Sequence, residues 1–298
     1  MPVTFYATLD ATTLTAGTLA YIPATAVLLP ASSWAGLWRR DRRKAQKRAG
    51  TNTYARTQLP LPALPPALDY AVDPGGYLMT LVYRQYLYTP RELVTWCQAL
   101  TPAPQWVATP DRCCEPELIA ADAGKIALRQ AWTTRMAWHC WRTYRAGAWA
   151  WVPTVQGWAV SDYIRHATEL APLIAEMAAY YGPGSAFRVG IGTLCRRLST
   201  SAIRAVVSAV AAILPGIPLH LWGVKLGTLQ DRVQLPVSVV SVDSAAWNGN
   251  QQIVRAVWQA TGQTRRRYVL TAPTAGLRGY LAKVAAAQTN PKQMEMAL

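Results

Sequence analysis

Three aspartates in this chain follow short apolar runs that we expect to be β-strands. They are Asp73, Asp111 and Asp243, in a chain with only 15 acidic residues. An aspartate in this place can cap the next helix, but the same pattern three times favours a shared site. Two carboxylates that face one buried ligand cannot easily both ionise, so their pKa values separate and leave one nucleophile and one acid. The residues therefore predict acid/base and nucleophilic chemistry.

Eight such apolar runs occur, and stretches of helical periodicity lie between several of them. The clearest helix is expected over Asp162–Tyr181, and others over Arg91–Leu100 and Ser201–Leu214. Alternation of strands and helices is typical of a parallel sheet. Eight strands in 298 residues favour an α/β fold of the TIM-type (β/α)8 barrel class, in which the chemistry lies at the carboxyl ends of the strands. A doubly wound open sheet is the alternative, but no GxGxxG follows an early strand. The predicted strands are Val3–Thr8, Ala26–Pro30, Asp69–Asp73, Trp106–Pro110, Trp151–Gln156, Phe187–Gly192, Pro218–Val224 and Val237–Asp243.

We expect one barrel domain over residues 1–288, with a basic, Pro- and Thr-rich insertion at about 39–66 and a short tail at 289–298. The formal charge of +15 favours a polyanionic partner, either nucleic acid or an anionic membrane surface. A membrane is the weaker alternative because the two long uncharged stretches are interrupted by prolines and polar residues. Candidate phosphate contacts, each of which can also be a solvated surface charge, are Arg39, Arg40, Arg42, Arg43, Arg196, Arg197 and Lys225.

The cysteines and histidines do not form a metal-binding pattern. The five cysteines lack a CxxC pair, which favours free thiols in a reducing cytoplasm. His139, His166 and His220 are far apart in sequence, so we expect no metal site. The adjacent Cys113 and Cys114 could be reactive, but packing is the favoured role. No secretory signal is visible at the start of the chain, so a cytoplasmic location is expected.

Six motifs occur in an order that resembles a known family. They are Ala71–Tyr77 (AVDPGGY), Trp106–Asp111 (WVATPD), Pro153–Trp158 (PTVQGW), Val189–Arg197 (VGIGTLCRR), Leu219–Lys225 (LHLWGVK) and Val242–Trp247 (VDSAAW). Each motif alone is weak, but the ordered set resembles the deazapurine DNA-modification transglycosylases, relatives of the tRNA-guanine transglycosylases. The resemblance spans residues 3 to about 250 and implies a TIM barrel that exchanges a base without breaking the phosphate backbone.

The resemblance also implies roles for individual residues. Asp243 matches the family's nucleophile, which forms a covalent ester with the sugar, and Asp73 matches its general acid/base. Asp111 and Gln156 match positions that bind the purine edge. The glycines of the base site are Gly75, Gly76, Gly157 and Gly192. The implied partners are DNA and a free 7-deazaguanine such as 7-cyano-7-deazaguanine, with partner proteins that could help to open the DNA.

The chain departs from the family pattern in two places. Pro74 stands where the family has a serine, which removes a hydroxyl and an N–H from the turn after Asp73. The tRNA enzymes carry a late zinc site, whereas no Cys or His follows Asp243 here. We therefore expect no zinc cofactor and favour DNA over RNA. Three alternatives remain open at this point. One is the same base exchange on RNA, with a hydrolase that removes the base and never replaces it as a variant. Another is a non-catalytic nucleic-acid-binding barrel, and the third is a phosphate-binding metabolic barrel.

Overall fold

The structure is a computed structural model of the chain. It describes residues 3–9, 26–31, 64–80, 85–119, 124–195, 197, 199–224, 226–230, 234–244, 277 and 279–288. In these ranges nine strands form one sheet in which every pairing is parallel. The strands are β1 (Thr4–Thr8), β2 (Ala26–Pro30), β3 (Tyr70–Asp73), β4 (Trp106–Ala108), β5 (Ala150–Val152), β6 (Thr154–Val155), β7 (Val189–Ile191), β8 (Leu219–Leu221) and β9 (Val239–Ser244).

The sheet closes on itself at Pro153. The strand order is β5-β4-β3-β2-β1-β9-β8-β7-β6, so its two ends are β5 and β6. These two strands are separated by Pro153 alone, which has no N–H to donate to a neighbouring strand. They are therefore two halves of the single strand expected over Trp151–Gln156. The eight predicted strands all occur, and the prediction of a TIM-type barrel is confirmed.

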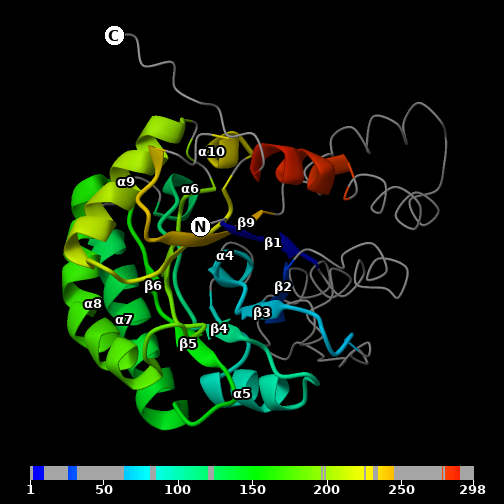
Figure 1. Ribbon diagram of the computed structural model, residues 1–298. Coiled ribbons are helices and arrows are strands. Elements are labelled where there is room, and N and C mark those ends of the chain that lie inside the picture. Colours follow the sequence, from blue (N-terminus) through cyan, green and yellow to red (C-terminus); the bar gives the residue numbers. More distant parts are fainter. Residues whose placement is uncertain are drawn as a thin grey trace, which may run out of the picture.

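Helices lie outside the strands, with the long ones along the left-hand and lower sides of the barrel in Figure 1. The long ones are α5 (Pro90–Gln98), α7 (Gly124–Tyr144), α8 (Val160–Tyr181) and α9 (Thr200–Ile213). Short helices α4 (Gly76–Leu78), α6 (Pro116–Ile119) and α10 (Leu226–Gln230) follow β3, β4 and β8. Each of these lies beyond the carboxyl end of a strand, at the end of the barrel where such folds carry their sites. The predicted helices correspond to α5, α8 and α9, whereas α7 was not predicted.

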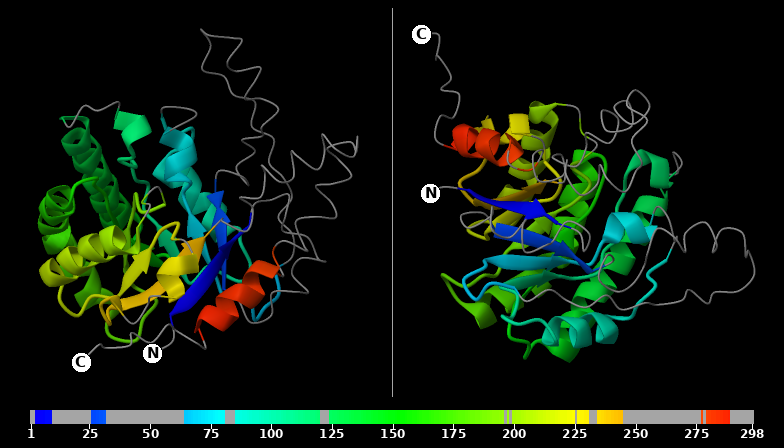
Figure 2. Two further views of the ribbon diagram at one scale, coloured as in Figure 1. Left: turned by 90° about the horizontal axis from the view of Figure 1, so that it is seen from above. Right: turned by 90° about the vertical axis from the view of Figure 1, so that its right-hand side faces the viewer.

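Residues 279–288 are helical and pack against β1, as both views of Figure 2 show. The ring of Tyr280 lies 6.0 Å from that of Phe5, and the Gln288 amide donates to the Val3 carbonyl oxygen at 2.7 Å. The first strand and a segment close to the end of the chain are therefore joined in one hydrophobic core.

The interior of the barrel is aromatic and polar as well as aliphatic. Tyr6 and Trp106 meet edge to face at 5.2 Å, and the Trp106 indole donates to the Tyr6 hydroxyl at 3.0 Å. His220 lies 5.0 Å from Trp106 and 4.4 Å from Trp222. Trp106, Tyr6 and His220 are almost fully buried. A polar barrel core is costly unless its groups are paired, so these groups indicate a role beyond packing.

Candidate active site

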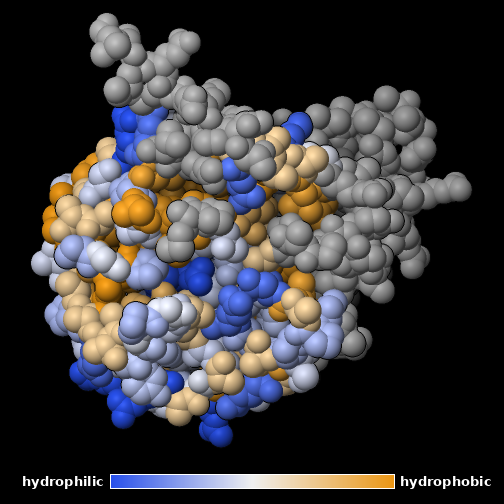
Figure 3. Space-filling model, viewed as in Figure 1, coloured by the Kyte–Doolittle hydropathy of each residue, from blue (hydrophilic) through white to orange (hydrophobic). Residues whose placement is uncertain are grey.

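The three predicted aspartates all lie at the carboxyl ends of strands. Asp73 is the last residue of β3, Asp243 is next to last in β9, and Asp111 lies in the loop after β4. The charges of Asp111 and Asp243 both raise the pKa of Asp73, so all three carboxyl groups share one site. On the face drawn in Figure 3, hydrophilic residues gather near the centre, over the barrel.

Asp73 is held in a tight turn by its own backbone. Its Oδ1 accepts from the Gly75 N–H at 2.8 Å, and Gly75 adopts the left-handed conformation at φ 75° that favours glycine. Pro74 is buried, and its carbonyl oxygen accepts a hydrogen bond from the Tyr88 hydroxyl. Burial raises the pKa of Asp73 to about 7, the Gly75 N–H opposes this, and the neighbouring carboxylates add to it. Asp73 can therefore exist as an acid near neutral pH.

Asp243 lies among hydrogen-bond donors. The Gly223 N–H donates to its Oδ1 at 2.8 Å, and the Thr8 hydroxyl donates to its Oδ2 at 3.1 Å. His220 Nε2 lies 3.4 Å from Oδ1. The side chain is only 9% exposed. Both carboxylate oxygens are thus oriented, which a nucleophile needs if it is to meet one carbon atom in line.

A chain of polar side chains continues from Asp243 into the barrel. His220 Nδ1 lies 2.9 Å from the Ser241 hydroxyl, which accepts from the Arg188 guanidinium at 2.8 Å. Burial lowers the pKa of His220, so the ring is neutral and carries one proton. That proton belongs on Nε2, because this nitrogen faces a carboxylate oxygen, and Nδ1 then accepts from Ser241. With this tautomer the donors run in one direction, from Arg188 through Ser241 to His220, and the last step to Asp243 is a 3.4 Å contact rather than a hydrogen bond.

Asp111 and Gln156 form the second half of the site. The Gln156 amide donates to Asp111 Oδ2, and its oxygen accepts from the Thr193 hydroxyl at 2.6 Å. The Tyr86 hydroxyl accepts from the Asp111 N–H and donates to the Asp111 carbonyl oxygen, both at 2.9 Å. Burial raises the pKa of Asp111 to about 6, against the effect of the Gln156 and Tyr86 hydrogen bonds. The two side chains are locked to each other before any ligand binds.

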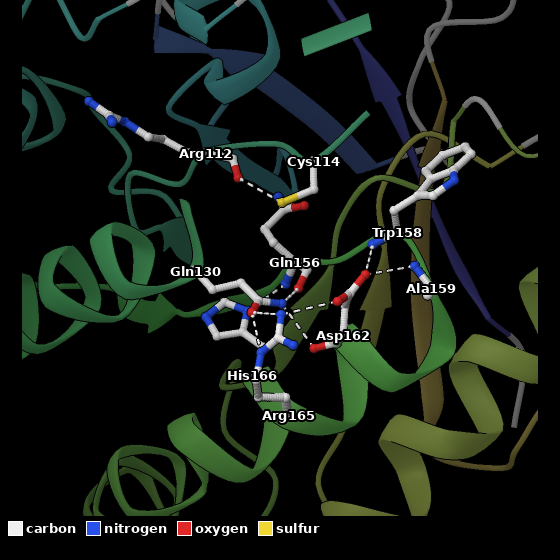
Figure 4. A network of polar contacts seen from close by, with 9 residues as sticks. All are labelled: Arg112, Cys114, Gln130, Gln156, Trp158, Ala159, Asp162, Arg165 and His166. Carbon is white, nitrogen blue, oxygen red and sulfur yellow. Dashed lines mark hydrogen bonds and ion pairs between the residues drawn. The ribbon is translucent and has the colours of Figure 1, made fainter. Parts of the chain in front are cut away.

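A network from α7 and α8 fixes the backbone of Gln156 (Figure 4). Its N–H donates to His166 Nδ1 at 2.8 Å, and its carbonyl oxygen accepts from the Gln130 amide at 2.6 Å. The Gln130 oxygen in turn accepts from Arg165 at 2.7 Å. Burial lowers the pKa of His166 to about 4, so the ring is neutral, with Nδ1 as acceptor and Nε2 facing Thr134 at 3.2 Å. His166 is therefore a positioning group for Gln156.

Two of the four predicted glycines make room for polar side chains of the site, and the other two shape the backbone and the packing around it. A Cβ on Gly76 would collide with the Asp111 carboxylate, and one on Gly192 with the Gln156 amide. A Cβ on Gly157 would meet Asp162 Cβ at 2.8 Å. Gly75 supplies the positive φ of the turn after Asp73. Their expected contact with a base stays a prediction.

Of the seven predicted phosphate contacts, six lie outside the described residues. These are Arg39, Arg40, Arg42, Arg43, Arg196 and Lys225. Arg197 is described, and its guanidinium donates to the Trp158 carbonyl oxygen and lies 4.9 Å from the Trp158 ring and 5.5 Å from the Tyr163 ring. In this position it packs over the loop after β6, and its contact with phosphate stays a prediction.

The cysteines near the site are buried thiols. Burial raises the pKa of Cys113 well above its usual range and that of Cys114 to about 12, which fits the favoured packing role. Within the described ranges, no three His, Cys, Asp or Glu side chains are grouped so that they could hold a metal ion. No helix in the same ranges is both long and apolar enough to cross a membrane.

Sequence patterns did not reveal several residues of the site. They are Thr8, Tyr86, Gln130, His166, Thr193 and His220. Only His220 carried a signal, because it alternates with Trp222 in a predicted strand and both residues point into the barrel. The others act through contacts between segments that are distant in the chain.

The fold and the site define a (β/α)8 barrel protein with a carboxylate- and amide-lined site at the carboxyl ends of its strands. The chain belongs to the DpdA family, DeoxyPurine in DNA protein A, whose sequence profile matches residues 48–262, more than half of the chain. Membership gives the protein a role in deazapurine modification of DNA. The earlier resemblance to the deazapurine DNA-modification family is confirmed. Among curated proteins no sequence matches the chain significantly.

Proposed function

We propose that this protein is a base-exchange transglycosylase that replaces guanine in DNA with a 7-deazaguanine such as 7-cyano-7-deazaguanine. The reaction leaves the phosphate backbone intact and passes through a covalent ester between Asp243 and the deoxyribose. The target nucleotide leaves the base stack before it reacts, at a cost of roughly a few kcal/mol.

In the first step an Asp243 carboxylate oxygen attacks the sugar C1′. The C1′–N9 bond of guanine breaks, its electron pair moves to the base, and Asp73 donates a proton to the departing guanine. The surroundings of Asp243 support this role because they orient its carboxylate: the Gly223 N–H and the Thr8 hydroxyl donate to it, and His220 Nε2 lies 3.4 Å from Oδ1. Asp73, with a pKa of about 7, can supply the proton near neutral pH.

In the second step the free 7-deazaguanine takes the place of guanine. Asp73, now a carboxylate, accepts the N9 proton of the incoming base, whose nitrogen attacks C1′ and displaces Asp243. Two displacements at one carbon retain its configuration, as in retaining glycosidases. Asp73 regains its proton and Asp243 its free carboxylate, so the enzyme ends the cycle as it began.

Asp111 and Gln156 are suited to the edge of a guanine. Guanine offers donors at N1 and N2, which suit a carboxylate, and an acceptor at O6, which suits an amide N–H. The Gln156 amide gives one N–H to Asp111, and its other N–H, which makes only a long 4.0 Å contact to Cys113 Sγ, can turn to O6 when a base binds. Replacing N7 by carbon leaves this edge unchanged, so one site can receive both bases. Adenine presents the opposite pattern at N1 and its exocyclic group.

The observation that carries the proposal is the pairing of a protonatable Asp73 with a donor-held Asp243 at one end of the barrel. Pro74, the feature that favoured a non-catalytic binder, does not displace Asp73, because the Gly75 N–H holds the carboxylate. Membership of a DNA-modification family favours DNA over RNA.

The test is exchange of radiolabelled guanine, and of labelled 7-cyano-7-deazaguanine, into duplex DNA and in parallel into bulk tRNA. We expect label in DNA with the wild type and a loss of at least about a thousandfold with Asp243→Ala, which removes the nucleophile. Thr95→Ala, an exposed change on α5, is the matched control and should exchange as the wild type does.

Each other result would indicate a different function for this protein. Label in tRNA alone would make RNA the substrate, and release of guanine without uptake of either base would indicate a hydrolase. DNA binding without release of guanine or uptake of a base would favour the non-catalytic nucleic-acid-binding barrel. Full exchange by Asp243→Ala would remove the covalent mechanism while it left the substrate assignment intact.

A further inference from the structure

Three arginines gather beside the base-binding half of the site. Arg112 directly follows Asp111, and Arg129 and Arg135 lie on α7. The Arg112 N–H donates to the Thr133 hydroxyl at 3.0 Å, which fixes the loop after β4 on the helix. The guanidinium of Arg112 lies 4.5 Å from the centre of the Trp132 ring. Figure 4 shows this side chain directed away from Gln156, toward the outside of the site.

Within the part of the chain that the structure describes, this cluster has no ion-pair partner. Among the described residues no carboxylate forms an ion pair with Arg112, Arg129 or Arg135. Partial burial lowers the pKa of Arg112, and the charges of the other two arginines lower it further. Like charges held close together favour the binding of an anion, because the anion relieves their repulsion.

We propose that Arg112 and Arg135, supported by Arg129, form a phosphate-binding site for the DNA backbone beside the nucleotide that is exchanged. The inference rests on the proposed function, since it takes DNA as the substrate. A guanidinium matches two phosphate oxygens through parallel N–H groups, and stacking on Trp132 holds its plane while leaving that edge open.

The position of the cluster explains why it would matter for base exchange. Trp132 also stacks on Tyr86, at 5.2 Å and 18° between the planes, and Tyr86 is the hydroxyl that holds Asp111. The phosphate site and the base site therefore share one rigid support. A DNA backbone bound at the cluster stays at a fixed distance from Asp111. This distance keeps the extruded base aligned with the catalytic carboxylates.

Arg129 has a second task within the cluster. It donates to the carbonyl oxygens of Cys113 at 2.9 Å and Leu118 at 3.2 Å, so it ties the loop to α7. Its removal would disturb the loop as well as the charge. Arg112 and the exposed Arg135 are therefore the residues to change.

The chain offers a matched control on the same helix. Arg142 lies 4.3 Å from the Trp138 ring, so Arg142→Ala removes the same charge and the same kind of stacking contact. It lies in the last turn of α7, about 20 Å along the helix from Arg129. Because α7 runs back from β4 to β5, that turn is at the end of the barrel opposite the site.

The experiment measures binding of a 20-base-pair duplex over a range of salt concentrations for the wild type, Arg112→Ala, Arg135→Ala, the double variant and Arg142→Ala. Each lost phosphate contact lowers the slope of log K against log salt by about 0.9 and weakens binding about eightfold at 0.1 M salt. We expect a loss of one contact in each single variant, two in the double variant and none in Arg142→Ala. Arg112→Lys should keep most of the slope, because the charge remains.

The outcomes separate this inference from the proposed function. Unchanged slopes in Arg112→Ala and Arg135→Ala, or an equal loss in Arg142→Ala, would overturn the phosphate site even if base exchange were established. Arg112-dependent binding of free deoxyguanosine monophosphate with an unchanged DNA slope would also overturn it. If the slopes fall as expected but no base is exchanged, the phosphate site stands and the exchange reaction fails. In an active enzyme, Arg112→Ala should raise KM for DNA by about as much as it weakens DNA binding, whereas Arg142→Ala should leave KM for DNA unchanged.

Discussion

The raised pKa of Asp73 makes the stability of the protein depend on pH in a way that Asp73→Asn should remove. Burial and two neighbouring carboxyl groups raise this pKa from 3.8 to about 7. The folded protein therefore holds a proton that the unfolded chain has already lost between about pH 4 and pH 7. Stability falls with rising pH wherever the folded state binds more protons, so Asp73 destabilises the fold increasingly across this window.

The size of the effect follows from the same numbers. Each pH unit within the window costs about 1.4 kcal/mol, so the interval from pH 5 to pH 7 corresponds to about 3 kcal/mol. Solvent reaches part of the Asp73 side chain, and we therefore expect about 2 kcal/mol between pH 5 and pH 8. Asn has nearly the same shape and no charge. The free energy of unfolding of Asp73→Asn relative to the wild type should thus be higher by about 2 kcal/mol at pH 8 than at pH 5.

Urea unfolding at pH 5 and pH 8 measures this difference, and Asp111→Asn provides a graded comparison. The pKa of Asp111 is raised to about 6, so its window is shorter and the gain between the same two pH values should be about 1 kcal/mol. If Asp73→Asn changes stability equally at both pH values, or if Asp111→Asn gains more, the assigned protonation of Asp73 is wrong. An active enzyme should also lose its first chemical step above about pH 7, as Asp73 loses the proton it must donate.

Two further predictions concern the positioning of the site. Gly192→Ala should raise KM for the free base at least tenfold, because the added Cβ would displace the Gln156 amide. The control is Gly227→Ala, whose added Cβ would meet nothing within 4 Å and should leave base binding unchanged. Equal kinetics for both variants would show that Gln156 does not bind the base. His220→Phe should lower kcat by about tenfold to a hundredfold with little change in either KM, since it releases one contact of Asp243. His220→Gln, which keeps an N–H donor, should recover part of that loss, and steady-state kinetics that showed no recovery would reduce His220 to a packing role.

The strands could be predicted from the sequence because a closed parallel barrel buries them on both faces. Each strand then appears as a short apolar run that ends at a polar residue. The chemistry-bearing aspartates follow from the same rule, since the strand ends of such a barrel meet at one end. The one irregularity, the break between β5 and β6, comes from Pro153, which was visible in the sequence but lay inside a run that otherwise looked continuous.

The helix α7 could not be predicted because its buried face is partly polar. The buried positions include Gln130, Thr133 and Thr134 beside Ile126 and Ala137, so the periodicity is helical but the hydrophobic pattern is weak. The reason is visible in the site. Gln130 holds the Gln156 carbonyl, Thr133 holds the Arg112 N–H, and Thr134 faces His166. Contacts of this kind join segments far apart in the chain, and no local pattern records them.

The interior of the barrel shows the same relation between function and composition. In barrels of this fold, layers of branched aliphatic side chains usually fill the interior, whereas here Arg188, Ser241 and His220 occupy it. Burying such groups is costly unless each has a partner, and all three are joined in a single chain that ends at Asp243. A hydrophobic interior would be easier to stabilise, but among the described residues it would leave the Asp243 carboxylate with the Gly223 and Thr8 contacts alone. The polar core therefore serves to position a nucleophile. The apolar layer between the strands and the surrounding helices has to supply the stability that a hydrophobic interior would otherwise provide.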